Sequence, residues 1–208
     1  MSVRTERPIN RQQVIDAALA IVDEHGSDAL TMRAVGKRVD RHVSSLYNHV
    51  ANRSELVELL SAHVAQSIDV SSFGVETWDV ALTRWAVSYV DAFLDHPNLV
   101  TILAFSPVRD LPTLENYERI FGSLVAEGWH VLDATVVVRT VEAFTWGSIL
   151  DLTASPVQLE PADIPEDLPV MRTILESANE DRVSGQAAFE IGLSALMDGL
   201  RARHGTAT

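Results

Sequence analysis

The chain has 208 residues, of which 47% are hydrophobic, and it carries a formal net charge of −13 and no cysteine. The lack of cysteine excludes disulfides, zinc–thiolate sites and cysteine nucleophiles, and the apolar runs fall short of the roughly 20 residues that span a membrane. Because residues 1–13 also lack the apolar stretch of a signal peptide, we expect a cytoplasmic protein that has no membrane partner.

The charge is divided unevenly along the chain. Residues 1–53 contain eight basic and six acidic side chains, a net charge of +2, whereas residues 54–208 contain eight basic and 23 acidic side chains, a net charge of −15. A strongly acidic surface repels nucleic acid. The division therefore indicates two parts with different partners, and only the first part suits DNA.

The first part of the chain contains clear signals for short helices. Asn10 and Gln13 have the spacing of a capping box, and Gly26 is a natural helix stop. Thr31 is placed as the N-cap of a second helix. These signals predict short helices separated by tight turns.

Apolar residues recur at helical spacing through the rest of the chain, which predicts an all-α fold of about nine or ten helices. A longer helix is expected to begin at the capping box of Asn52 and Glu55 and to continue to about residue 69 as a connector. Further helices are expected from Trp78 to the Asp95-His96-Pro97 stop, from an Asn98 cap to about 106, and over 114–125, 131–154 and 189–203. A solvated loop between the last two is predicted from Pro156, Pro161, Pro165 and Pro169.

Residues 30–60 have the organisation of a helix-turn-helix unit, in which two short helices and a turn precede a longer helix. We therefore expect a three-helix DNA-binding domain over 1–53 and a larger helical domain over 54–208. An arginine in this unit can form two hydrogen bonds with a guanine, and short hydroxyl or planar side chains suit the major groove. The candidate DNA-contacting residues are Thr31, Arg33, Arg41, Val43, Ser44, Ser45, Tyr47, Asn48, His49 and Arg53.

Two residues of this unit have structural alternatives. Leu46 is expected in the core of the three-helix domain rather than at DNA. His49 suits a buried, hydrogen-bonded position as well as a phosphate contact, since imidazole serves in both roles.

Several of these residues form an ordered set. Arg33 is followed by Leu46-Tyr47-Asn48-His49-Val50 on the expected recognition helix and then by Asn52-Arg53. In this order the set resembles the TetR (tetracycline-repressor) family of transcriptional regulators. The segments 144–147 and 189–193 are similar to the C-terminal domain of the subgroup that contains the tetracycline repressor itself.

The turn departs from the family pattern. Gly36 stands where members usually have alanine, and Asp40 and Arg41 stand where they have glycine and an apolar residue. Asp40 can adopt the left-handed conformation that such a turn needs. Arg41 removes an apolar anchor and adds a cation for a phosphate. These changes predict a turn that is looser than in typical members or is ordered only on DNA.

The resemblance implies a homodimer on palindromic double-stranded operator DNA, with a small-molecule inducer inside the larger domain and no cofactor. The dimer would form through the family's eighth and tenth helices, here 131–154 and 189–203. Small side chains that permit close helix approach are present in the last helix and just before it, namely Ala187, Ala188, Gly192, Ala195 and Gly199.

The inducer implied by the resemblance is not a tetracycline–magnesium complex. Trp85, Leu103 and Ile120 occupy positions where the tetracycline-binding members have polar or metal-holding side chains, and only Asp151 preserves a carboxylate. An apolar, aromatic cavity remains, with Asp151 or His63 as a polar anchor. The candidate ligand-contacting residues are His63, Trp85, Tyr89, Phe93, Leu103, Phe121, Phe144, Trp146 and Asp151.

Two other functions stay open from the residues alone. The chain could be a DNA-independent interaction module, if its unusual turn has lost operator binding. It could also be a helical metal-dependent enzyme, although no two of His63, His96, His130, Glu142 and Asp151 have the Glu-x-x-His spacing typical of helical metal ligands. Alanine replacement of Arg33 or Tyr47 separates the first reading from a repressor, since a module has no DNA shift to lose.

Overall fold

The computed structural model describes residues 9–153, 163–178 and 185–206. These residues form ten α-helices, which confirms the predicted all-α fold. The helices are α1 (Arg11–His25), α2 (Met32–Arg38), α3 (Val43–Leu46), α4 (Arg53–Ala65), α5 (Trp78–Leu94), α6 (Val100–Leu103), α7 (Leu111–Ala126), α8 (Val131–Thr153), α9 (Pro169–Ala178) and α10 (Gly185–Thr206). None of these described helices combines the length and the apolar character needed to cross a bilayer.

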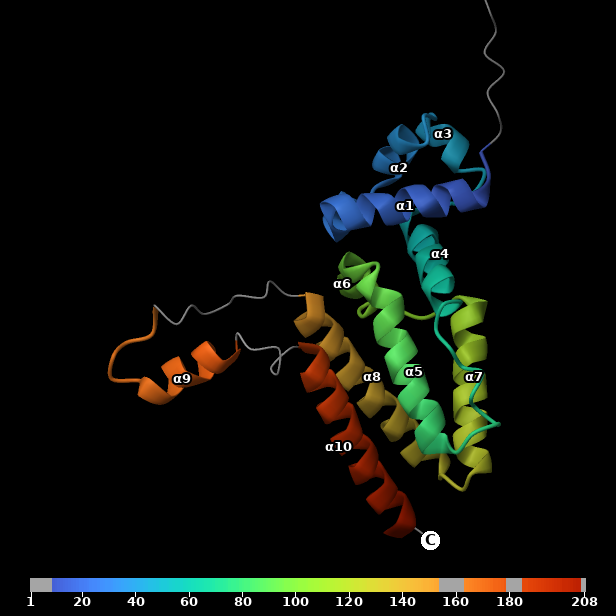
Figure 1. Cartoon of the computed structure of the whole chain (residues 1–208). Coiled ribbons are helices and arrows are strands. Elements are labelled where there is room, and N and C mark those ends of the chain that lie inside the picture. The colour runs from blue at the N-terminus through green and yellow to red at the C-terminus, as the bar shows by residue number, and fades with distance from the viewer. Residues whose placement is uncertain (1–8, 154–162, 179–184, 207–208) are drawn as a thin grey trace, which may run out of the picture.

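The helices are arranged as a small head on a larger bundle. Helices α1, α2 and α3 form the head, and α4 runs from it into a bundle that contains α5, α7, α8 and α10 (Figure 1). Helix α9 lies to one side of the bundle (Figure 1). The short α6 lies at the end of the bundle that faces the head (Figure 1).

The predicted signals at the ends of α1 and at the start of α2 are confirmed. Asn10 Oδ1 accepts a hydrogen bond from the Gln13 N–H at 2.8 Å, and Gln13 Oε1 accepts one from the Asn10 N–H at 3.0 Å. Gly26, with a φ of 79°, follows the last residue of α1. Thr31 Oγ1 accepts from the Ala34 N–H at 3.1 Å and caps α2.

The start of α4 differs from the predicted capping box in one bond. Asn52 Oδ1 accepts from the Glu55 N–H at 3.0 Å, as expected. Glu55 Oε2, however, accepts from the Ala51 N–H at 2.6 Å, one residue before the cap, while Glu55 Oε1 pairs with Arg11 of α1 at 3.2 Å. The carboxylate therefore ties the start of α4 to α1, and α4 ends at Ala65, earlier than predicted.

Helix α5 forms the centre of the bundle and packs against α8 and α10. Trp78, Leu82, Trp85 and Phe93 recur at helical spacing and are buried, while Tyr89 on the same face is partly buried. This aromatic face was predicted from the spacing. Its burial removes several large side chains from water, which stabilises the bundle.

Asn98 does not cap the helix that follows it, which is a correction to the prediction. The 3₁₀ turn Pro97–Leu99 precedes α6, and the Asn98 amide donates hydrogen bonds to the carbonyls of Val22 and Asp23 at 3.0 and 3.2 Å. The last carbonyls of α1 have no partners within the helix. A side chain from the larger part of the molecule therefore completes the end of a head helix.

The prediction of a proline-containing loop before the last helix is wrong at the C-terminal end of that loop. Pro156 and Pro161 lie outside the described residues, and Pro165 lies in a turn closed by the Leu168 N–H. Pro169, however, begins α9. Proline is tolerated at the first position of a helix because its missing N–H would have no partner there.

Candidate functional site

Helices α2 and α3 approach each other closely at Gly36. A Cβ on Gly36 would lie 3.1 Å from the Arg41 carbonyl oxygen and 3.5 Å from the Leu46 side chain. The Arg41 N–H donates to the Gly36 carbonyl at 2.9 Å, and Asp40 between them has a φ of 53°. The left-handed Asp40 is therefore confirmed, and the turn is closed by backbone bonds and side-chain packing.

Helix α3 is a single turn, shorter than the predicted recognition helix. It ends at Leu46, and the N–H groups of His49 and Val50 both donate to the Leu46 carbonyl. Tyr47, Asn48 and His49 therefore lie in a turn that follows the helix rather than on the helix itself. Leu46 and Val50 are buried, which confirms the structural alternative for Leu46 and anchors both ends of this turn.

The remaining face of α3 and its turn is polar and open to solvent. Tyr47 is 54% exposed. The exposed members of the predicted set are Thr31, Arg33, Ser44, Tyr47, Asn48 and Arg53, and the half-buried members are Arg41, Val43, Ser45 and His49. His42 was missed by the sequence reading, although it is exposed at the start of α3 with its Nδ1 at 3.2 Å from Ser44 Oγ.

The basic side chains of the head divide into engaged and open ones. Arg38 forms two hydrogen bonds with Glu24, at 2.6 and 2.5 Å, and these bonds lower the pKa of the Glu24 carboxyl. Arg53 Nε donates to the Leu30 carbonyl at 3.0 Å. Arg33 and Lys37 are exposed and have no ion-pair partner among the described residues. Arg33 and Lys37 are therefore the cations of α2 that are open to a phosphate or a base edge.

A cavity of about 350 Å³ lies inside the bundle between α4, α5, α6, α7 and α8. Five of the predicted ligand residues line it, namely Trp85, Tyr89, Phe93, Leu103 and Trp146. Ile120 lines it as well. This is one of the positions at which the tetracycline-binding members have a polar or metal-holding side chain. A cavity of this size with several aromatic lining residues is typical of a small-molecule site.

The aromatic rings of the cavity pack against one another. Tyr89 stacks on Phe93 with ring centres 5.4 Å apart, and Trp146 meets both of these rings edge-on at 5.3 and 4.8 Å. Trp85 meets Tyr89 edge-on at 5.6 Å. One wall is therefore a continuous aromatic surface.

The other four predicted ligand residues do not line this cavity. Phe144 stacks on Phe189 of α10, and with Asp151 it lines a second cavity of about 290 Å³ on the α8–α10 side. Phe121 stacks on Tyr117, which itself lines the main cavity. His63 is half-buried on α4, while its neighbour Val64 lines the cavity. Each of these four side chains lies on a helix whose other face reaches the cavity.

The polar end of the cavity was missed by the sequence reading. Tyr117 of α7 donates a short hydrogen bond to Glu142 Oε1 of α8, and both residues line the cavity together with Arg139. Burial raises the pKa of Glu142, and the Tyr117 bond and the Arg139 charge oppose this shift. Burial and the nearby Glu142 charge raise the pKa of Tyr117 strongly, so Tyr117 remains a donor at neutral pH. The signal in the sequence was Glu142 itself, a carboxylate among apolar residues in the middle of α8.

The carboxylate content of the cavity bears on the kind of ligand. Among the described residues that line the cavity, Glu142 is the only acidic one, and none is a histidine. In the described residues, no group of three or more His, Asp or Glu side chains is placed to hold a metal ion.

A helix-turn-helix head joined to a helical bundle with an internal cavity is the architecture of a ligand-responsive transcriptional regulator. Residues 73–204 match the family model described as the tetracycline repressor-like C-terminal domain. The tetracycline repressor protein class D of Escherichia coli is 30% identical over 92% of this chain and 88% of its own length. The chain belongs to the TetR family of transcriptional regulators.

Solved structures of related proteins share the fold. The TetR family protein ActR of Streptomyces coelicolor, in complex with (S)-DNPA, superimposes with a TM-score of 0.75 at 25% identity and covers 95% of this chain and 99% of its own. A TetR variant from Acinetobacter baumannii AYE in complex with minocycline has a TM-score of 0.70 at 26% identity and covers 93% of this chain and 97% of its own.

Proposed function

We propose that this regulator is a repressor that binds a palindromic operator as a homodimer and is released when a small aromatic ligand fills the main cavity. In this proposal residues 1–53 are the DNA-binding domain, residues 54–208 bind the ligand and dimerise, and the chain is not an enzyme. The observation that carries it is the position of α6, whose Leu103 lines the cavity while the turn before it contacts α1 of the head.

The proposed DNA-contacting face is the polar side of α3 and its following turn. Leu46 and Val50 face the core of the head, so the exposed Ser44, Tyr47 and Asn48 lie on the outer side. Hydroxyl and amide groups can read base edges in the major groove. Arg33 on α2 adds an exposed cation next to this face.

The proposed dimer interface is the outer face of α8 and α10. Val136, Ala143, Gly147 and Leu150 are exposed and follow one another at seven, four and three residues along α8. Ala188, Ile191 and Ala195 form a similar exposed stripe on α10. Small and apolar side chains at such spacing support close helix packing across a two-fold axis. Replacing Ile191, which is 71% exposed, should lower the affinity between the two subunits more than it lowers the folding stability of one subunit.

The proposed ligand class rests on the cavity and on two relatives. The aromatic wall suits a flat ring system, and the related proteins were solved with (S)-DNPA and with minocycline. Neither of these compounds is assigned to this chain. The lining of the cavity favours an organic ligand over a metal chelate, because its described residues offer one carboxylate.

The experiment is a selection of operator DNA from a library of duplexes with a random centre, followed by binding measurements on purified variants. The selected sequence should be palindromic, because the two heads of a dimer are related by two-fold symmetry. Arg33→Ala and Tyr47→Ala should each weaken binding by about 1–3 kcal/mol, the usual contribution of a base contact. Arg119→Ala, which removes an exposed arginine of α7, is the matched control and should bind normally.

The outcomes separate the alternatives. Ile191→Glu should yield monomers in light scattering and lose operator binding, since a single head has half of the site. If no duplex is enriched although the wild-type chain is a dimer, the protein is an interaction module and the repressor proposal is wrong.

A further inference from the structure

Glu142 presents a carboxylate oxygen to the main cavity. Tyr117 donates a hydrogen bond to Glu142 Oε1. No other described residue donates a hydrogen bond to this carboxylate. Oε2 is therefore available to a ligand. The Tyr117 bond also fixes the direction of the carboxylate, so the acceptor is preorganised before a ligand enters.

The Glu142 charge has no paired cation in the described structure. Arg139, one turn earlier on α8, lines the cavity and lowers the Glu142 pKa through its charge, but it is exposed and forms no ion pair with Glu142. A half-buried carboxylate without a paired cation is unfavourable. A positively charged ligand group relieves this, whereas a neutral group leaves the charge uncompensated.

The aromatic wall has the same preference. Trp146 lies one turn after Glu142 on α8 and shares its face, and Trp146 packs edge-on against Tyr89 and Phe93. The faces of such rings attract cations through their quadrupoles. A cation near Glu142 is therefore attracted by the carboxylate and by adjacent rings together.

We propose that the cavity takes aromatic ligands that carry a cationic amine, with the amine at Glu142 Oε2 and the ring system against Trp146, Tyr89 and Phe93. This inference rests on the proposed ligand-binding function of the cavity and names the chemical class of the ligand. Glu142 and Tyr117 are then the residues that set specificity, and Arg139 opposes the binding of a cation at the same end.

The test uses three naphthyl compounds that share the same ring and substitution position. These are naphthylmethylammonium, naphthylmethanol and naphthoate, which are cationic, neutral and anionic at neutral pH. Their affinities for the full-length wild-type dimer are measured by isothermal titration calorimetry. The cation should bind about tenfold more tightly than the alcohol, as expected for a hydrogen bond to a charged group, and the anion should bind least.

Four variants assign the preference to the cavity. Glu142→Gln should reduce the ratio of cation to alcohol affinity to about one, because it removes the charge at nearly constant shape. Arg139→Gln should increase that ratio. Glu118→Gln removes an exposed carboxylate of α7 outside the cavity and should leave the ratio unchanged. Ala104→Trp, at the α6 side of the cavity, should weaken all three ligands together.

The possible failures are distinguishable. If the three compounds bind equally, and Ala104→Trp weakens all of them, the cationic class is wrong while the aromatic ligand site stands. If Glu142→Gln retains the full preference for the cation, the assignment to Glu142 is wrong. If none of the three binds to the folded dimer, both this inference and the proposed aromatic ligand are overturned.

Discussion

His96 Nδ1 lies 2.9 Å from Asp23 Oδ2, and this contact joins the turn before α6 to the C-terminal end of α1. The neighbouring Asn98 amide donates to the carbonyls of Val22 and Asp23. A few residues further along the chain, Leu103 lines the cavity. One short segment therefore contacts the helix-turn-helix head at one end and lines the main cavity at the other.

We predict that this segment carries part of the coupling between ligand and operator. His96→Ala combined with Asn98→Ala should reduce the coupling free energy by about 0.5–2 kcal/mol, the usual effect of a residue between two linked sites. Operator affinity is measured with and without saturating naphthylmethylammonium. Arg119→Ala, which removes an exposed arginine of α7, is the control. An unchanged ratio of operator affinities in the double variant would contradict the coupling role.

We predict that Gly36 and Gly122 respond differently to alanine. Gly122 lies inside α7 with nothing near its Cβ position, so Gly122→Ala should stabilise the protein by up to about 1 kcal/mol through helix propensity. Gly36→Ala has the same propensity gain, but its Cβ would press on the Arg41 carbonyl. It should therefore gain less stability and weaken operator binding by displacing α3. Thermal unfolding and operator titration measure both effects, and equal behaviour of the two variants would show that the close approach at Gly36 is not required.

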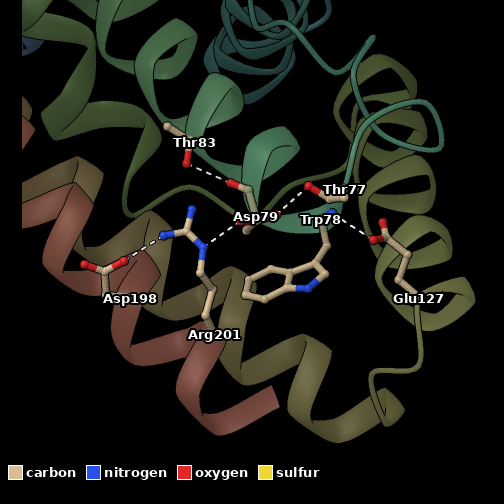
Figure 2. A network of polar contacts seen from close by, with 7 residues as sticks. All are labelled: Thr77, Trp78, Asp79, Thr83, Glu127, Asp198 and Arg201. Atoms are coloured by element: carbon tan, nitrogen blue, oxygen red, sulfur yellow. Dashed lines mark hydrogen bonds and ion pairs between the residues drawn. The ribbon is translucent and has the colours of Figure 1, made fainter. Parts of the chain in front are cut away.

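We predict an acid-sensitive ion pair at the end of α10. Arg201 Nε donates to Asp79 Oδ2 at 2.6 Å and Thr77 donates to Oδ1 at 2.6 Å (Figure 2). Burial raises the pKa of Asp79, but these hydrogen bonds outweigh it and the pKa is lowered overall. Because the folded-state pKa is below the unfolded one, the stabilisation is present above the ordinary Asp range and is lost as the pH falls through the folded value.

The Asp79 prediction has a matched control in Asp198, which bonds the same arginine at 2.7 Å (Figure 2). Asp79→Asn should lower the free energy of unfolding at neutral pH by about 1–2 kcal/mol, as for a broken charged hydrogen bond, and by less in acid. Asp198→Asn should change it by less than about 0.5 kcal/mol, because Asp198 is exposed and screened. Urea unfolding at several pH values distinguishes them, and equal losses in both variants would refute the assignment to Asp79.

We predict the opposite pH dependence for Glu142. Burial raises its pKa, so the folded state disfavours the ionised carboxylate, and stability present at low pH is lost as the pH rises through the folded pKa. Glu142→Gln should therefore be more stable than the wild type at neutral pH. The two stabilities should become similar at about pH 4, where the wild-type carboxyl is largely neutral. Melting temperatures across this range test the sign. A variant that is less stable than the wild type at every pH would contradict it.

The sequence by itself determined the local structure of this protein. The caps at Asn10 and Thr31, the stop at Gly26 and the left-handed Asp40 depend on bonds and sterics within a few residues of each site. The aromatic face of α5 follows from helical spacing alone. The all-α fold and the family therefore followed from short-range patterns.

Only the tertiary structure decided which side chains meet across helices. Asn98 has a capping position in the sequence, yet its amide binds the Val22 carbonyl at the end of α1. Phe144 and Trp146 are two residues apart on α8 but face α10 and the cavity respectively. Periodicity shows that both faces of α8 are apolar, but it does not assign a partner to each face. The packing of α5 and α10 against α8 makes that choice, and the packing of α7 against α8 places Glu142 beside Tyr117.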